Sequence, residues 1–110
     1  MKGTNLGEFE ELVMLAVGIL HPHAYGVGIK EEIFLQTERN VTLSTIHSAL
    51  HRLEKKGLLD SNFGEATNIR GGKRKKYFTI TAFGARCLKD AHELRDNMYR
   101  TIPSLVLNQV

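Results

Sequence analysis

Apolar residues recur at helical spacing near the start of the chain. They predict a helix over about residues 6–20, capped by Thr4 or Asn5, with an inward face formed by Leu6, Phe9, Val13, Ala16, Val17 and Leu20. Three acidic residues suit the positive end of its dipole: Glu8, Glu10 and Glu11. Apolar residues nearly encircle its second half, which indicates a central place in the core or in a subunit contact. The proline of His21-Pro22-His23 should end the helix.

Two more helices are expected before the middle of the chain. One fits residues 26–37, with Ile29, Ile33 and Phe34 facing inward. The next fits residues 42–56 and should stop at Gly57, because glycine readily forms a left-handed C-terminal cap.

Alternating residues then indicate two paired strands, over residues 58–66 and 76–81. Thr81 is a good N-cap for a last helix that reaches at least Arg100. The predicted fold is therefore mostly α with a small two-stranded antiparallel wing, a winged helix-turn-helix followed by a C-terminal dimerisation helix. We expect residues 1–81 to form the DNA-binding domain and residues 82–110 the dimerisation helix.

The third predicted helix has two contrasting faces. Its core face should carry Ile46, Ala49, Leu50 and Leu53. The other face presents side chains that can donate hydrogen bonds to phosphates or base edges, namely Ser44, Thr45, His47, Ser48, His51, Arg52 and Lys55. Any surface helix has a polar face, so this pattern alone does not establish DNA binding. Thr42 and Tyr25 complete the expected contacts on the helices, although Tyr25 could instead serve in packing.

The charge of the chain is concentrated between the two strands. The chain has 15 Lys and Arg residues against 12 Asp and Glu, yet outside residues 70–76 the counts are 10 and 12. That segment holds Gly71 and Gly72 among five cations: Arg70, Lys73, Arg74, Lys75 and Lys76. A solvated hairpin tip would explain an isolated basic run. Because the run follows the polar-faced helix of residues 42–56, it is better explained as a wing that binds phosphates.

Several of these segments together resemble the PadR-type transcriptional regulators. They are Ala24-Tyr25-Gly26, Leu43-Ser44, residues 48–59 and residues 71–81 with Gly84, within a likeness that covers about residues 6–88. The resemblance implies a dimeric winged-helix DNA-binding protein, usually a repressor, with a helical C-terminal dimerisation region. The family usually has tyrosine at position 47 and often proline at position 48, where this chain has His47 and Ser48. The operator therefore does not carry over from the family.

The last helix carries an apolar stripe close to a coiled-coil seam. The expected dimerisation residues are Cys87, Ala91, Leu94, Met98 and Ile102. The alternative is that the stripe packs back onto the first helix. Pro103 should end or kink the helix, which leaves the contribution of Leu105 and Leu107 open. A homodimer would present two reading helices and favour a near-palindromic site.

Composition and motifs argue against other classes of protein. A chain of 110 residues is one small domain, and its apolar run at residues 12–20 is too short to cross a bilayer. Its single cysteine fits a cytoplasmic location. His47 and His51 lie four residues apart without a further ligand motif, so we expect no metal site. The chain has no Gly-x-Ser-x-Gly motif, phosphate loop or dinucleotide fingerprint, so we expect no cofactor and no enzymatic activity. The partners expected are double-stranded DNA, a second copy and a small-molecule effector that the sequence does not identify, with no membrane. The alternative is a winged-helix interaction module that binds an acidic partner.

Overall fold

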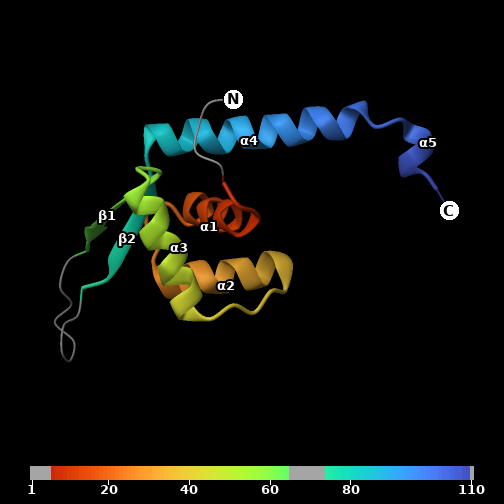
Figure 1. The fold of residues 1–110 in the computed structure, drawn as a ribbon. Coiled ribbons are helices and arrows are strands. Elements are labelled where there is room, and N and C mark those ends of the chain that lie inside the picture. Colours follow the sequence, from red (N-terminus) through yellow and green to blue (C-terminus); the bar gives the residue numbers. More distant parts are fainter. Residues whose placement is uncertain (1–5, 65–73, 110) are drawn as a thin grey trace.

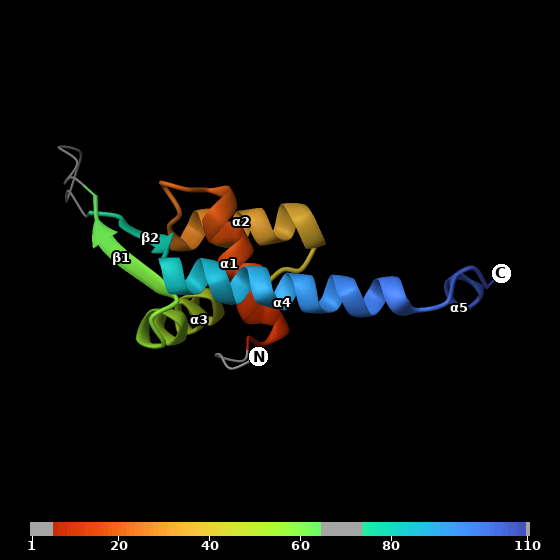
Figure 2. The same ribbon diagram turned by 90° about the horizontal axis from the view of Figure 1, so that it is seen from above.

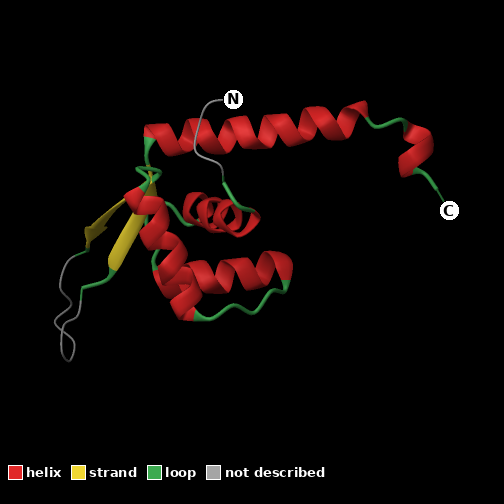
Figure 3. Cartoon of the chain, in the orientation of Figure 1, coloured by secondary structure: helices red, strands yellow, loops and turns green. Residues whose placement is uncertain are grey.

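A computed structural model describes residues 6–64 and 74–109 of the chain. The helices are α1 (Glu8–Ile19), α2 (Gly26–Thr37), α3 (Leu43–Lys55), α4 (Ala82–Thr101) and the short α5 (Ser104–Leu107), and the strands are β1 (Leu59–Phe63) and β2 (Lys76–Ile80) (Figures 1 and 3). This order confirms the predicted winged helix-turn-helix with a helix after the wing.

The two strands pair antiparallel and reach back to the turn between α1 and α2. Leu59 lies opposite Ile80, and Phe63 lies opposite Lys76. The Phe78 N–H donates to the Ala24 carbonyl at 2.8 Å, which makes an isolated bridge beside the sheet. The base of the wing is thereby attached to the segment that leads into α2.

The core lies between α1, α2, α3 and the sheet. The side chains of α3 that point inward are those the sequence predicted, Ile46, Ala49, Leu50 and Leu53. They meet large, fully buried residues of α1, α2 and the start of the wing, among them Val13, Met14, Val17, Ile29, Leu58 and Leu59. Burial of such side chains is the main source of stability in a domain of this size.

Three caps fix the ends of α3 and the start of α4. The Thr42 hydroxyl accepts the Thr45 N–H at 3.2 Å at the start of α3. At the other end of α3, Gly57 has φ of 79°, and Leu58 N–H donates to the Leu53 carbonyl at 2.9 Å, as in a Schellman motif. The Thr81 hydroxyl accepts the Gly84 N–H at 2.9 Å, which confirms Thr81 as the N-cap of α4.

Several predicted details were wrong. Helix α1 begins later than expected, with Gly7 as its N-cap, because the Glu10 carboxylate accepts the Gly7 N–H at 3.2 Å and closes the first turn. Phe34 is 49% exposed, since it lies about 100° around α2 from buried Ile33. Strand β1 ends at Phe63, and β2 ends at Ile80 because the next residue caps α4. The predicted strand residues 65 and 66 lie outside the described residues.

Helix α4 extends well past the rest of the domain. It has 20 residues and is therefore about 30 Å long. Figures 1 and 2 both show its start lying against the three-helix body and its end projecting beyond it. In the part of the chain that the structure describes, no helix is both long and apolar enough to cross a membrane.

Candidate nucleic-acid interface

The outward face of α3 is polar and open to solvent. Ser44, Thr45, His47, Ser48, His51 and Lys55 are all exposed. The Thr42 hydroxyl lies 2.8 Å from the Thr45 hydroxyl and 3.2 Å from that of Ser44, so capping joins these three side chains into one cluster at the start of the helix. Short hydroxyl side chains allow a helix to approach base edges closely and to donate or accept hydrogen bonds there.

The His47 ring lies beside Gly26 at the start of α2. A Cβ atom added to Gly26 would lie 2.8 Å from the His47 Cε1 atom, so only glycine leaves room for the ring in this position. This contact explains why glycine follows Tyr25 at the start of α2.

A hollow of about 240 Å³ separates α3 from β2. It is lined by His47, Leu50, His51, Glu54, Lys76 and Phe78. Glu54 accepts a hydrogen bond of 2.5 Å from the Ser61 hydroxyl and lies 3.6 Å from the Lys76 ammonium. The Glu54 carboxylate at this edge of α3 is thus paired with the wing, through Ser61 of β1 and Lys76 of β2.

Arg52 is directed toward α1 instead of standing free on the polar face. Its Nε donates to the Glu10 carboxylate at 3.4 Å, and the Lys56 ammonium donates to the same carboxylate at 3.2 Å. Burial would raise the pKa of Glu10, but the Gly7 N–H, Lys56 and Arg52 outweigh it and lower that pKa below its ordinary value. The sequence offered no sign of this pairing, because Glu10 and Arg52 are 42 residues apart.

Aromatic rings support the base of the wing. The Lys75 ammonium lies 4.3 Å from the centroid of the Tyr25 ring, and the rings of Tyr25 and Tyr77 meet edge to face at 6.3 Å. The rings of His23 and Tyr77 also meet edge to face, with centroids 5.5 Å apart. Tyr25 is therefore packed within this cluster and holds a predicted phosphate-binding lysine. Sequence reasoning missed His23 and Tyr77, because only the folded sheet brings residues 23–25 beside β2.

Three cations lie next to these aromatic rings, at the start of β2. Arg74, Lys75 and Lys76 are exposed, while the predicted contacts Arg70 and Lys73 lie outside the described residues. Figure 1 shows the two strands running alongside α3. A polar helix face and a row of cations on one side of the protein can engage base edges and phosphates at the same time. In residues 6–64 and 74–109 there is no group of three His, Cys, Asp or Glu side chains that could hold a metal ion.

The apolar stripe of α4 divides into a covered and an uncovered part. Cys87 and Ala91 are buried within the same chain, whereas Leu94 is 53% exposed and Met98 64% exposed. An ion pair between Arg95 and Glu11 marks the place where α4 passes α1. The stripe therefore serves the core of the chain at its start and remains available to another surface further along.

Comparison with known proteins gives a consistent result. The family model of the transcriptional regulator PadR-like family matches residues 15–90. No curated protein sequence matches the chain. A transcriptional regulator from Clostridium thermocellum is 26% identical, with coverage of 88% of this chain and 91% of its own and a TM-score of 0.67.

Two further solved structures resemble the chain over most of their length. A PadR family transcriptional regulator from Eggerthella lenta is 25% identical, covers 93% of this chain and 88% of its own, and has a TM-score of 0.68. A PadR-like transcriptional regulator from Bacillus cereus shares the fold at 19% identity, with coverage of 92% and 93% and a TM-score of 0.72.

Proposed function

The chain belongs to the PadR-like family of transcriptional regulators, and from this premise we propose that it is a homodimeric repressor acting on a near-palindromic operator in the cytoplasm. The observation that carries the proposal is the exposed, acid-free outward face of α3 beside the cations of the wing. The family relationship supports regulation through DNA. The roles of single residues are our own assignment.

We assign sequence reading to α3. Helix α3 enters the major groove, where the side chains near its start reach base edges, namely Ser44, Thr45, His47, Ser48 and His51. Thr42 fixes the start of the helix by capping it, and Lys55 binds the DNA backbone. Arg52 is assigned a positioning role, because Glu10 holds its guanidinium on the side of α1.

The wing supplies phosphate contacts. Arg70, Lys73, Arg74, Lys75 and Lys76 bind the backbone beside or within the minor groove. Such contacts add affinity and set the register of the protein on DNA, but they carry little sequence information. Tyr25 contributes by holding Lys75 through the contact between its ring and the ammonium group.

We divide the chain into a DNA-binding domain, residues 1–81, and a dimerisation helix, residues 82–110. Within the second part, dimerisation is assigned to the exposed end of α4. Leu94, Met98 and Ile102 form an apolar stripe that a second copy would cover. Two reading helices related by a two-fold axis then require a site with two inverted half-sites.

Gel shift on genomic fragments tests the proposal directly. Wild-type protein should retain a small set of fragments, and Ser48→Asp should abolish that retention, because a carboxylate on the outward face of α3 repels phosphates. Leu35→Asp is the matched control, since it adds the same charge at an exposed position of α2 outside the proposed interface. Equal retention of all fragments would instead favour non-specific binding. Unimpaired retention by Ser48→Asp would show that α3 does not read DNA.

A further inference from the structure

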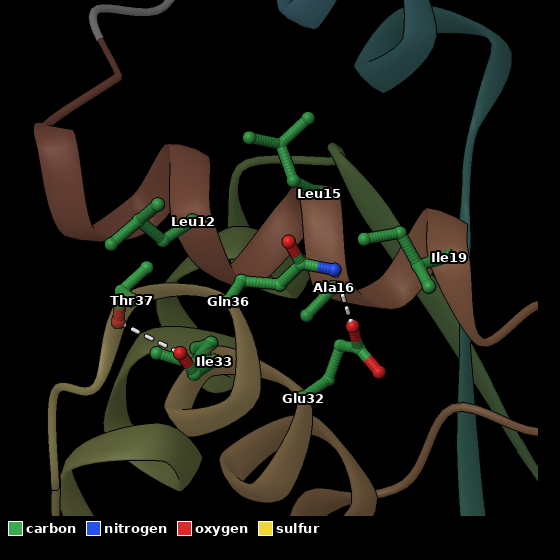
Figure 4. A pocket seen from close by; sticks show the side chains of 8 residues that line it. All are labelled: Leu12, Leu15, Ala16, Ile19, Glu32, Ile33, Gln36 and Thr37. Atoms are coloured by element: carbon green, nitrogen blue, oxygen red, sulfur yellow. Dashed lines mark hydrogen bonds between the residues drawn. The ribbon is translucent and has the colours of Figure 1, made fainter.

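An apolar groove runs between α1 and α2, away from the proposed DNA face. Its volume is about 170 Å³, and it is lined by Leu12, Leu15, Ala16 and Ile19 from α1 and by Glu32, Ile33, Gln36 and Thr37 from α2 (Figure 4). An apolar cavity of about 150 Å³ holds a benzene-sized group, so this groove has room for a branched aliphatic side chain.

The polar groups on the rim of the groove are paired with one another. The Gln36 amide donates to the Glu32 carboxylate at 2.9 Å, and the Thr37 hydroxyl donates to the Ile33 carbonyl at 2.7 Å (Figure 4). On its open side, Leu15 is 46% exposed and Ile19 is 56% exposed. The groove therefore offers mainly apolar surface, which suits an apolar occupant.

The chain also carries an apolar segment without a matching surface. Pro103 separates α4 from α5, and the short α5 presents three consecutive apolar residues. Leu105 is 82% exposed, and Val106 and Leu107 are also exposed. Burying one such side chain is favourable by about 1.5–3 kcal/mol, so an uncovered run of three favours a partner surface.

Symmetry brings these two features together. Met98 lies midway along the uncovered stripe between Leu94 and Ile102, four residues from each. In an antiparallel two-fold pair centred on Met98, Leu94 of one copy meets Ile102 of the other. Ile102 and Pro103 are extended, so the chain that follows them lies beyond Leu94 of the other copy, toward Ala91 and the start of its α4.

That stretch of α4 is the part that passes over α1. Arg95 is paired with Glu11 of α1. Figures 1 and 2 show α4 passing over α1. The end of the partner's chain consequently arrives at α1, close to the groove. In the same arrangement, α5 continues the interface made by the uncovered half of α4.

We propose that α5 of each copy docks into the α1–α2 groove of the other, with Leu105 as its main anchor. This inference rests on the proposed homodimer and extends it from a helix pair to an exchange of chain ends. The occupant of the groove is thus a second copy of this chain. The two symmetric contacts would also fix the separation of the two α3 helices, because α1 packs directly on α3 in the core.

Site-directed cross-linking tests the docking. One chain carries Leu105→Cys and a size tag, and an untagged chain carries Gln36→Cys on the rim of the groove. After mixing and mild oxidation, the mixed disulfide-linked dimer should form at least about tenfold faster than with a Leu35→Cys partner. Leu35 is the neighbour of Gln36 on α2 but does not line the groove, so it serves as the matched control. Native Cys87 is buried and present in both pairs.

A second variant measures the contribution of the anchor. Leu105→Asp should raise the dissociation constant of the dimer about tenfold, while Leu35→Asp should leave it unchanged. Both positions are largely exposed in a single chain, so neither change should disturb folding. Sedimentation of the same samples tests the homodimer separately from the docking of α5. A wild-type monomer at micromolar concentration would overturn the dimer and the docking together.

Two results would overturn the docking but leave the dimer standing. One is a dimer in which Leu105→Cys cross-links no faster to position 36 than to position 35, or not at all. The other is an unchanged dissociation constant for Leu105→Asp. Mass spectrometry under native conditions examines the other possible occupant. An apolar small molecule that is retained by the wild-type dimer and blocks the cross-link would assign the groove to that ligand instead of α5.

Discussion

Neutralising two wing cations should weaken the salt dependence of DNA binding without changing sequence preference. The variant is Arg74→Gln with Lys75→Gln, at exposed positions beside the start of β2. The slope of log K against log salt is negative, and each lost phosphate contact makes it shallower by about 0.9, so the loss of two contacts makes it shallower by about 1.8. Between 50 and 200 mM salt, the ratio of wild-type to variant affinity should therefore shrink about 12-fold. The loss of affinity is greatest at low salt.

Fluorescence anisotropy on a retained fragment and on a scrambled sequence gives both quantities. The ratio of the two affinities should stay the same for wild type and variant, since phosphate contacts carry no sequence information. Lys75 also lies over the Tyr25 ring, a contact that contributes about 0.5–1 kcal/mol at an exposed site, so thermal unfolding of the variant is measured alongside.

A control with the same change of charge separates contacts from net charge. Arg86→Gln with Lys89→Gln removes two exposed cations from the first half of α4, outside the proposed DNA contacts. Its slope should match that of wild type. An unchanged slope for the wing variant would refute the assignment of Arg74 and Lys75 to phosphates, and an equal change in the control would attribute the effect to overall charge.

Three further changes test the parts that support the interface. Gly26→Ala should displace His47, since its new Cβ would lie 2.8 Å from the ring, and should lower operator affinity several-fold while thermal unfolding changes little; unchanged affinity would exclude a role for the ring position. Glu10→Gln should cost about 1 kcal/mol in urea unfolding at pH 7. Because the folded-state pKa of Glu10 is lowered, its contribution to folding stability is complete at neutral pH and is lost as the pH falls through that pKa. The unfolding free energies of wild type and variant should therefore converge in acid. A difference that stays constant with pH would contradict this account. Gly84→Ala should destabilise the fold by about 3 kcal/mol, because the added Cβ would lie 2.1 Å from the Leu58 carbonyl oxygen. Urea unfolding close to that of wild type would show that the start of α4 can shift.

The sequence predicted the faces of α3 because local periodicity determines them. A helix of 13 residues with one apolar stripe leaves little choice about which side is buried. The caps at Thr81 and Gly57 were also predictable, since each depends on the chemistry of one residue and its nearest neighbours. The inward placement of Phe34 failed because α2 buries only a narrow stripe, and periodicity alone does not give its width.

Contacts between distant segments could not be predicted in this way. The cluster of His23, Tyr25 and Tyr77 forms only once the segment before α2 bridges to β2. The pairing of Arg52 with Glu10 likewise depends on how α1 packs against α3. In both cases the residue types were visible in the sequence, but their partners were set by tertiary packing.

The first turn of α1 shows how these distant contacts could bear on function. Its acidic residues do more than complement the helix dipole, because each pairs with a different part of the fold. Glu8 pairs with Arg39 before α3 at 2.9 Å, Glu10 with Arg52 and Lys56 at the end of α3, and Glu11 with Arg95 of α4.

One turn of helix thus links the proposed reading helix to the proposed dimerisation helix. The exposed pair between Glu8 and Arg39 contributes little to stability, typically below about 1 kcal/mol. The carboxylates of Glu10 and Glu11 are largely covered, so their pairs hold the helices in a fixed orientation. Several pairs converging on one turn resist a rotation of α4 relative to α3. In the proposed dimer, that resistance would hold the two reading helices at a fixed separation, and so determine which spacing of half-sites the protein accepts.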